Sequence, residues 1–407
     1  MKYEPLQKIF YTNPTDYEAI YHSRYNSTDT WKCDFHIGKH PAFVTMSNEI
    51  WKLTTEILRL DKKLAHLLLP QVTPGVAIKQ FVNSCIVDEV KLTNEIEGIH
   101  STRREIQSVI TASSVREKKE NRLRGLVSKY ILLLTSEEPL ALETPEQVRK
   151  LYDEIVLPEI KESNGDAPDG KLFRKDGVDV LSKGGKVIHK GTMPENAIIS
   201  DIIKALNVLN DTKNEPLVNI AVFHYLFGYI HPFYDGNGRM SRFISSSFLS
   251  RQVCNIVGLG LSYTIKENIS IYYNIFKITN HPNNRGDLTA FVIEFLGFLK
   301  ITIERIILAL EEKGKQLQFY SEKIFKNKDV PSKEESVLFV ILQSTLFSEE
   351  DGITISEITK YVNFHQHKPI SSATIRQLVI GLNNMLLIEK IGKANYYSIN
   401  LAALDNL

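Results

Sequence analysis

Residues 231–242, which read HPFYDGNGRMSR, decide the fold that we predict for this chain. Upstream, residues 217–230 (LVNIAVFHYLFGYI) are apolar on nearly every face, which predicts a helix that is buried all round. Pro232 disfavours the α conformation at the residue before it, so this helix should end at His231. Downstream, residues 240–252 resume a helical pattern. The stretch is therefore expected to join two core helices.

The loop has the composition of a phosphate-binding turn. In residues 235–238 (Asp-Gly-Asn-Gly), two glycines around an asparagine permit positive φ angles and can turn backbone N–H groups toward an anion. The loop opens into a helix N-terminus, where free N–H groups and the helix dipole also favour phosphate. Arg239 and Arg242 are three residues apart and share a helix face, and their planar guanidinium groups suit phosphate oxygens.

Two further residues of the stretch predict chemistry on a nucleotide. Asp235 supplies a hard oxygen for Mg²⁺, which normally accompanies a polyphosphate. His231 can accept a proton near neutral pH, and the two nearby arginines should disfavour its protonated form. The alternative is a glycine-rich turn with a surface pair of arginines, which leaves the combination of imidazole, carboxylate and guanidiniums unexplained.

The stretch resembles the signature His-Pro-Phe-x-(Asp/Glu)-Gly-Asn-Gly-Arg-x-x-Arg of the Fic family and matches it at every specified position. The resemblance implies a mainly α fold, with a Fic-type helical core and a β-hairpin flap. It also implies transfer of AMP from ATP to a hydroxyl of a target protein or of the protein itself, with release of pyrophosphate. The segments expected are an N-terminal helical region with an inhibitory motif (1–110), the catalytic core (111–315) and a winged-helix-like domain (330–407).

The resemblance also implies a role for each residue of the loop. His231 becomes the general base, and Asp235 the Mg²⁺ ligand between the α- and β-phosphates. Asn237 and the glycine amides are expected at the α-phosphate. Arg239 and Arg242 are expected at the β- and γ-phosphates. The full set of ATP-binding residues implied is Asp235, Gly236, Asn237, Gly238, Arg239, Arg242, Val187, Ile188, His189, Tyr272, Tyr273 and Asn280.

A second motif precedes the core. Residues 77–96 repeat apolar positions at helical spacing, and Thr93 and Glu97 share a face at the end of that helix, with Gly98 as a C-cap. Thr93 to Gly98 fits the inhibitory pattern (Ser/Thr)-x-x-x-Glu-(Gly/Asn) of one Fic subclass. The resemblance implies that Glu97 pairs with Arg242 and occupies the place of the γ-phosphate. The plainer interpretation is a solvated helix carboxylate.

Residues 178–189 carry the clearest β signal of the chain. An alternating segment, a Ser-Lys-Gly-Gly turn and a returning segment predict a hairpin. It could be a simple surface ribbon. The resemblance instead makes it the flap that covers the nucleotide and aligns the main chain of the target by strand addition. The flap residues expected near the nucleotide are Val187, Ile188 and His189.

Tyr272 and Tyr273 share a helical region with Asn280. Tyrosines at helical spacing are often core residues. The resemblance places them around the adenine, with a stacking ring and an amide hydrogen bond from Asn280. Both interpretations remain open. Arg174 resembles a recurrent family position, to which the sequence assigns no role.

Beyond residue 330 the chain resembles a winged helix. The helices are expected at 335–346, 355–362 and 372–387, and the strands at 388–391 and 396–399. Arg376 is the only basic residue of the third helix. From Pro331 onward, six Lys or Arg stand against eight Asp or Glu, a net charge of −2, which is a weak electrostatic footprint for DNA. Protein contact or homodimer formation is therefore the favoured use.

The amino-acid composition is that of an ordinary globular protein. The 407 residues are 43% hydrophobic and 24% charged, as in a globular protein, and the net charge of +1 gives no global attraction to nucleic acid or membrane. Three cysteines without metal-ligand spacing favour reduced thiols in a cytoplasmic protein. We see neither an apolar signal core nor a long apolar span, so no membrane partner is expected. Residues 1–46 suggest an ordered arm of short elements, without an assigned task.

Two classes of function follow from these observations. The first is an autoinhibited protein adenylyltransferase acting on Ser, Thr or Tyr hydroxyls, with ATP and Mg²⁺. The second is a regulatory protein in which the core senses nucleotide and the winged-helix region makes the contacts. The intact catalytic positions favour the enzyme. A reverse activity, removal of AMP with Glu97 as base, is kept as an alternative within that class.

Overall fold

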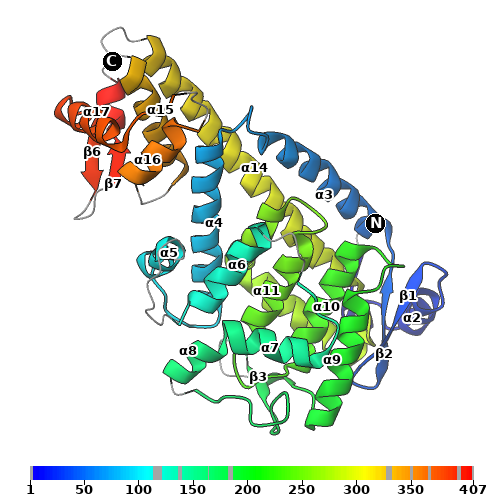
Figure 1. The fold of residues 1–407 in the computed structure, drawn as a ribbon. Coiled ribbons are helices and arrows are strands. Elements are labelled where there is room, and N and C mark those ends of the chain that lie inside the picture. The colour runs from blue at the N-terminus through cyan, green and yellow to red at the C-terminus, as the bar shows by residue number, and fades with distance from the viewer. Residues whose placement is uncertain are drawn as a thin grey trace. The chain divides into compact units, whose positions relative to one another are not determined.

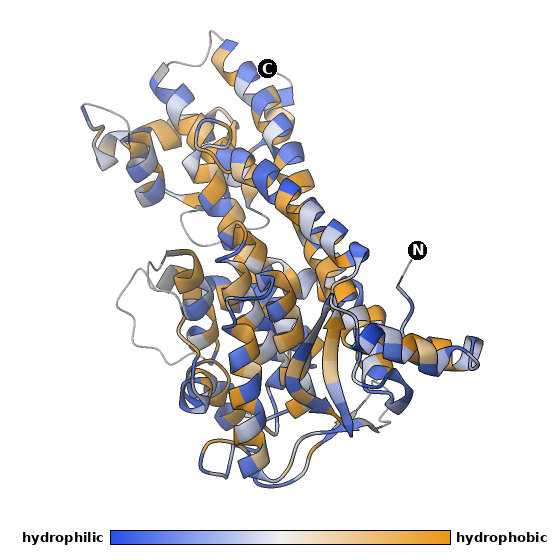
Figure 2. Ribbon diagram, turned by 90° about the vertical axis from the view of Figure 1, so that its right-hand side faces the viewer, coloured by the Kyte–Doolittle hydropathy of each residue, from blue (hydrophilic) through white to orange (hydrophobic). Residues whose placement is uncertain are grey.

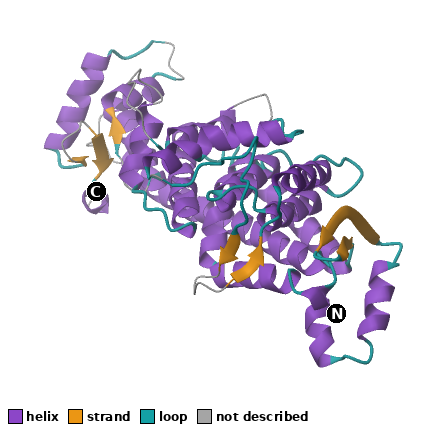
Figure 3. Cartoon of the chain, turned by 90° about the horizontal axis from the view of Figure 1, so that it is seen from below, coloured by secondary structure: helices purple, strands orange, loops and turns teal. Residues whose placement is uncertain are grey.

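The computed structural model describes residues 3–112, 122–135, 140–163, 165–181, 187–326, 332–348, 352–364, 368–391 and 396–405. The chain divides into two compact units, which are residues Met1–Asp61 with Ile86–Glu304 and residues Lys62–Cys85 with Arg305–Leu407. The described chain is mainly helical, as predicted, with three small sheets (Figure 3).

The first 155 residues contribute two helices and a hairpin, followed by longer helices (Figure 1). These elements are α1 (Leu6–Thr12), α2 (Tyr17–Tyr25), β1 (Thr30–Ile37), β2 (His40–Thr45), α3 (Asn48–Leu67), α4 (Gly75–Ile96), α5 (Arg103–Ala112), α6 (Arg124–Thr135) and α7 (Pro145–Ile155). The central part of the chain holds α8 (Leu157–Glu162), β3 (Asp179–Leu181), β4 (Val187–Lys190), α9 (Glu195–Leu209), α10 (Pro216–Ile230), α11 (Asn237–Leu249), α12 (Leu261–Glu267) and α13 (Ile269–Thr279). Short 3₁₀ helices lie at Asn255–Leu259 and Pro282–Asn284.

The last part of the chain begins with the long helix α14 (Thr289–Lys326). It continues with α15 (Ser332–Phe347), β5 (Ile353–Thr354), α16 (Ile355–Val362), α17 (Ser372–Asn384), β6 (Ile388–Ile391), β7 (Tyr396–Ile399) and α18 (Leu401–Asp405). Most helices carry hydrophobic and hydrophilic residues on different sides (Figure 2). No helix in the described ranges is both long enough and apolar enough to cross a membrane.

Helix α10 is the centre of the first unit. Every residue from Leu217 to Phe227 is buried, as predicted for a segment that is apolar all round. Helices α9 and α11 pack against it (Figure 1). Because this helix is held on all sides, the residue at its C-terminal end has a fixed position in the unit.

That residue is His231, and its backbone is left-handed, with φ 53° and ψ 63°. Pro232 keeps His231 out of the right-handed α region, as predicted, but the result is not the extended conformation that a following proline usually favours. The N–H of His231 donates to the carbonyl of Phe227 at 3.0 Å and closes the last turn. A left-handed residue is a common way to end a helix. Helix α11 then starts at Asn237, three residues before the predicted start at residue 240.

The N-terminal arm contains a hairpin that sequence analysis did not predict. Strands β1 and β2 pair antiparallel, with Thr30 opposite Thr45 and Ile37 opposite His40. The sequence does carry the alternating pattern of a strand, because Cys33, Phe35 and Ile37 alternate with polar residues. All three are buried in the structure.

The hairpin predicted at residues 178–189 is confirmed. Strands β3 and β4 pair antiparallel, with Asp179 opposite Lys190 and Val180 opposite His189. The predicted turn residues 182–185 and Lys186 lie outside the described residues. The hairpin belongs to the first unit, together with α10 and α11.

The second unit includes the predicted C-terminal elements. Helices α15, α16 and α17 match the expected positions, although α17 ends at Asn384 rather than at residue 387. The three-stranded sheet has the order β5-β7-β6. The two-residue strand β5 was not predicted, because so short a segment has no period. The turn at residues 392–395 lies outside the described residues.

Candidate active site

The imidazole of His231 lies half-buried at the end of α10. The pKa of His231 is lowered to about 4, chiefly by burial; the nearby charges of Arg174 and His189 also lower it, and the carboxylate of Glu97 opposes them. The imidazole is therefore neutral at pH 7. Sequence analysis expected neutrality from Arg239 and Arg242, whereas the structure attributes it to burial and to Arg174.

The loop after His231 is closed by its own asparagine. Asn237 is almost fully buried; its Oδ1 accepts the N–H of Phe233 at 3.0 Å, and its Nδ2 donates to the carbonyl of Phe233 at 2.8 Å. Both polar atoms of the amide are thus used to shape the loop. The backbone N–H groups that open α11 have no intrahelical partners and remain the groups suited to an α-phosphate.

Phe233 anchors this loop in the core. It is fully buried and stacks on Tyr152 of α7, with ring centroids 3.8 Å apart and planes at 14°. Phe173 contacts it edge-on, with a centroid distance of 5.4 Å. The aromatic contacts fix the loop against α7 and against the segment that leads to the flap.

Replacing Phe233 by alanine should lower the free energy of unfolding by about 3–5 kcal/mol, because it removes a fully buried ring. Urea denaturation measures the change. Tyr152→Phe is the matched control: it keeps the stack and removes a buried hydroxyl that has no hydrogen-bond partner among the described residues. We expect the control to change stability by less than about 1 kcal/mol. Equal losses in both variants would contradict this account of the anchor.

The two glycines of the loop have different reasons to be glycine. Gly236 has φ +81°, a conformation that favours glycine, and forms the N-cap of α11. Gly238 lies inside α11, and a Cβ there would meet Glu97 Oε1 at 2.1 Å and Arg242 Nη1 at 2.9 Å. Gly238 is therefore required for space rather than for a positive φ, which corrects the sequence interpretation.

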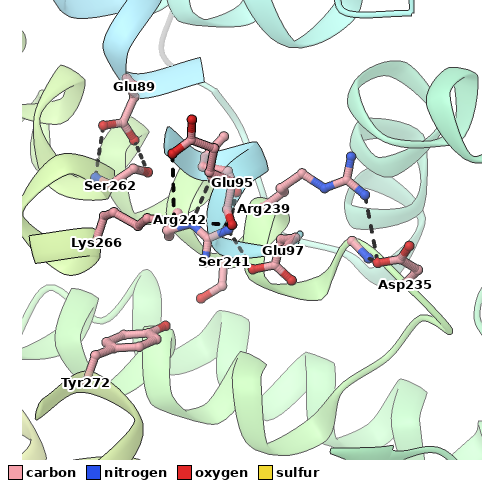
Figure 4. Close-up of polar contacts among 12 residues, drawn as sticks. Glu89, Glu95, Glu97, Asp235, Arg239, Ser241, Arg242, Ser262, Lys266 and Tyr272 are labelled. Atoms are coloured by element: carbon pink, nitrogen blue, oxygen red, sulfur yellow. Dashed lines mark hydrogen bonds and ion pairs between the residues drawn. The ribbon is translucent and has the colours of Figure 1, made fainter. Parts of the chain in front are cut away.

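Glu97 and Arg242 point toward one another (Figure 4). Arg242 is fully buried, and its Nη2 lies 2.7 Å from Glu97 Oε1. The same guanidinium donates from Nε to Thr93 Oγ1 at 2.8 Å and from Nη2 to the Thr93 carbonyl at 2.9 Å. The predicted pairing of Glu97 with Arg242 is confirmed, and Thr93 holds the same arginine. Gly98 is left-handed, with φ +78°, as expected for a C-cap.

A buried polar network lies around Arg242 (Figure 4). Glu89, two helical turns before Glu97, is fully buried; it accepts the N–H of Ser262 at 2.9 Å and the hydroxyl of Tyr130 at 3.2 Å. Burial raises the pKa of Glu89 to about 7, against the hydrogen bonds of Ser262 and the charge of Arg242. Sequence analysis considered only the apolar positions of residues 77–96 and did not predict a buried carboxylate among them.

Arg239 is also buried and paired. Its Nη1 contacts Glu159 of α8 at short range, and its Nη2 lies 3.8 Å from the half-exposed carboxylate of Asp235. Its Nε and Nη2 have no hydrogen-bond partner among the described residues. Unsatisfied buried donors favour an additional anion at this position. Sequence analysis missed Glu159, because helix α8 is six residues long and a single carboxylate shows no period.

The loop fits a Mg²⁺ ion that is shared with a polyphosphate. Mg²⁺ commonly takes one or two protein carboxylates together with phosphate oxygens and water. The Asp235 side chain is 54% exposed beside Arg239 and could supply one such oxygen. The described residues contain no group of three or more His, Cys, Asp or Glu side chains that could hold a metal by themselves.

The flap is attached to α10 through His189. Its ring stacks on Tyr229 at a centroid distance of 4.1 Å, and its Nε2 is 2.8 Å from the Tyr229 carbonyl. Burial lowers the pKa of His189. Val187 pairs with Leu181 across the hairpin, and Ile188 lies beside it in β4. The structure thus brings this strand to the end of α10, two residues before His231.

Of the three residues expected around the adenine, only some have side-chain groups that could contact a nucleotide base. Tyr272 is buried, and its hydroxyl is 2.8 Å from Nε2 of His224, within an aromatic core. Tyr273 is half-buried beside it, with ring centroids 5.7 Å apart. Asn280 accepts the hydroxyl of Tyr225 through Oδ1 at 2.6 Å, which leaves its amide donors for another group. The structure therefore supports a core role for Tyr272, whereas Tyr273 and Asn280 keep accessible groups.

Comparisons with known proteins agree with this geometry. Residues 142–249 match the Fic/DOC family. A protein from Drosophila mojavensis named protein adenylyltransferase Fic is 28% identical over 176 residues, which is 42% of this chain and 32% of that protein. Its namesake in Drosophila ananassae is 34% identical over 87 residues, 21% of this chain and 16% of that protein. The chain thus spans about a third or less of the length of these two relatives.

A crystal structure of a Fic family protein from Desulfovibrio desulfuricans G20 has the same fold, with a TM-score of 0.51 and 17% sequence identity. The alignment covers 88% of this chain and 97% of that one. The matched residues 142–249 include α7 to α11, the flap and the loop described above. The region of residues 142–249 therefore belongs to the Fic/DOC family.

Proposed function

We propose that the protein is an autoinhibited protein adenylyltransferase, which transfers AMP from ATP to a Ser, Thr or Tyr hydroxyl of a target protein or of itself. The observation that carries the proposal is the ion pair between Glu97 and the buried Arg242, next to the glycine loop and His231. A carboxylate held in this position occupies a site built for an anion. The relatives that are named protein adenylyltransferase support the same activity.

In this reaction the target hydroxyl attacks the α-phosphorus of ATP. The new bond joins the hydroxyl oxygen to that phosphorus, the bond to the β-phosphate oxygen breaks, and pyrophosphate leaves. His231 accepts the proton of the attacking hydroxyl, a role that suits a neutral imidazole. The rest of the catalysis is positioning and charge stabilisation, which the loop amides and arginines would supply.

Each phosphate has a candidate partner. The N–H groups at the start of α11 would hold the α-phosphate, the free donors of Arg239 the β-phosphate and Arg242 the γ-phosphate. Asp235 would hold Mg²⁺, which neutralises phosphate charge when it is bound. Tyr273 and Asn280 are the residues with groups free to contact the base.

Autoinhibition follows from the same arrangement. While Glu97 holds Arg242, the γ-phosphate has no cationic partner there, and the carboxylate repels it. ATP would then bind with its α-phosphate out of line with the attacking hydroxyl. Thr93 keeps two of its contacts to Arg242 even when Glu97 is removed, so the arginine stays in place.

The order of elements beyond residue 332 supports a winged-helix appendage. We assign it to protein contact or homodimer formation rather than to DNA, because the chain from Pro331 onward carries a net charge of −2.

Labelled nucleotide tests the proposal directly. The full chain carrying Glu97→Gly is incubated with Mg²⁺ and ATP labelled either at the α- or at the γ-phosphorus. The expected result is label on protein from α-labelled ATP only. Transfer of γ-label would show a phosphotransferase instead. ATP binding without any labelling would support a nucleotide sensor.

The pH dependence provides a separate prediction. Because the pKa of His231 is lowered to about 4, its basic form persists throughout the neutral range. We expect kcat/KM for AMP transfer to be flat above about pH 6 and to fall tenfold per pH unit only once the imidazole is protonated, below about pH 4. Initial rates of the Glu97→Gly protein in buffers of constant ionic strength measure it. An inflection near the ordinary histidine value of about 6.5 would contradict the assignment.

A further inference from the structure

Arg174, to which the sequence assigned no role, lies in the segment that leads to β3 and is fully buried. Its Nε donates to the carbonyl of His231 at 2.9 Å, and its Nη2 to that of Ile230 at 3.4 Å. Its Nη1 donates to the carbonyl of Asp176 at 2.6 Å, and Nη2 also to that of Thr192 at 2.8 Å. One guanidinium therefore bonds four main-chain carbonyls.

These carbonyls belong to three different segments. Ile230 and His231 form the C-terminal end of α10, Asp176 precedes strand β3, and Thr192 follows strand β4. Arg174 thus joins both ends of the flap to the main chain of the candidate base. No ion pair of Arg174 with a carboxylate occurs in the described ranges, so carbonyl dipoles at the end of α10 replace a counter-ion.

The main chain at residues 191 and 192 packs closely against the Arg174 guanidinium. A Cβ at Gly191 would meet Arg174 Nη2 at 2.4 Å and His231 Cβ at 3.2 Å, so any larger residue there would displace the guanidinium. The N–H of Gly191 donates to the Val178 carbonyl at 2.9 Å, and that of Thr192 to the Ile230 carbonyl at 3.0 Å. Next to the guanidinium, the two ends of the flap are thus bonded to each other at Gly191, and the flap is bonded to α10 at Thr192.

We infer that Arg174 is a positioning residue for the proposed AMP transfer: it holds the base of the flap against the main chain of His231. The inference rests on the proposed function, because the flap strand must place the hydroxyl of the target protein within hydrogen-bond reach of the His231 imidazole. Arg174 itself touches neither nucleotide nor target in this account. A shift of about 1 Å between flap and imidazole would cost up to about 10²-fold in rate.

Lysine cannot substitute for arginine here. The lysine ammonium has a single nitrogen atom. The four carbonyls instead lie around a planar guanidinium, whose three nitrogen atoms each donate in a different direction. Arg174→Lys keeps the charge and most of the volume while it removes the bridge. Arg149→Lys is the matched control: Arg149 donates to the Leu172 carbonyl at 2.9 Å in the same segment, and its other bond, to Asp153 Oδ1 at 2.8 Å, stays within α7.

The kinetic test uses the full chain in the Glu97→Gly background. We expect Arg174→Lys to lower kcat by about tenfold or more with KM for ATP within about threefold of its parent, and Arg149→Lys to leave both within about threefold. Millimolar guanidinium should restore part of the activity of Arg174→Ala, because it returns donors to the same carbonyls. An unchanged kcat in Arg174→Lys, or an equal loss in Arg149→Lys, would overturn the inference.

Hydrogen exchange provides a readout that does not need activity. The amides of Gly191 and Thr192 should exchange faster in Arg174→Lys than in the parent, while those of α10 before Phe227 keep their protection. Unchanged exchange at both amides would overturn the inference. Absence of AMP transfer from the parent would overturn the proposed function, and the exchange experiment would still decide whether Arg174 holds the flap.

Discussion

Replacement of His231 by alanine is expected to lower AMP transfer by about 10²–10⁴-fold in the Glu97→Gly background. The reason is that His231 is the neutral imidazole at the mouth of the glycine loop, where a target hydroxyl would lose its proton. The imidazole is assigned no contact with phosphate, so the affinity for ATP should change little. The measurement is kcat from α-labelled ATP, together with the dissociation constant for ATP from calorimetry.

His22→Ala is the matched control, since this histidine is exposed on α2 and should leave kcat unchanged. The outcome that would count against our assignment is a His231→Ala protein with most of its activity. In that case the base lies elsewhere, and His189, the neighbouring imidazole on the flap, becomes the residue to replace. A parallel loss of ATP binding would instead show that the replacement had disturbed the loop.

Replacement of Glu97 by glycine is expected to raise AMP transfer by about tenfold or more over the unmodified chain. A charge-assisted hydrogen bond contributes about 1.5–3 kcal/mol, and each 1.4 kcal/mol corresponds to a factor of ten in equilibrium. The Glu97 side chain is 22% exposed, so solvent screens part of this contribution. Removing the carboxylate frees Arg242 for the γ-phosphate and opens the space next to Gly238. The measurement is self-labelling with α-labelled ATP.

The control is Glu95→Gly, which introduces the same flexible residue into the same end of α4. Glu95 pairs with Lys91 at 3.6 Å and with Lys266 at 3.7 Å, whereas the carboxylate that pairs with Arg242 is Glu97. We expect it to leave transfer at the level of the unmodified chain. If both glycine variants were activated alike, loosening of the helix rather than release of Arg242 would explain the gain. No gain from Glu97→Gly would reject autoinhibition.

Much of the site could be predicted from sequence, because it is local. The loop from His231 to Arg242 is continuous in the chain, so its glycines, its carboxylate and its arginines are neighbours by construction. The pairing of Glu97 with Arg242 joins residues 145 positions apart, and it was predicted only through the resemblance to a family. A continuous apolar run predicted the buried helix α10, and an alternating pattern predicted the flap hairpin.

The rest could not be read from the chain because it depends on packing. Glu159 and Glu89 are carboxylates in segments whose faces are decided by neighbouring helices. The pKa of His231 is set by burial and by Arg174, 57 positions away, rather than by the arginines next to it in sequence. The requirement for glycine at position 238 also appears only once Glu97 is placed beside it.

The N-terminal arm is tied to the body of the first unit by its second strand. The N–H of Phe43 donates to the Gly286 carbonyl at 3.0 Å, and its carbonyl accepts the N–H of Leu288 at 2.9 Å. Leu6, Ile9 and Tyr17 cluster with the same phenylalanine. Truncating the protein at residue 47 to obtain a minimal catalytic fragment would uncover the start of α14 and leave this main chain without its pairing. Expression of a shortened version should therefore begin ahead of α1, with the arm retained.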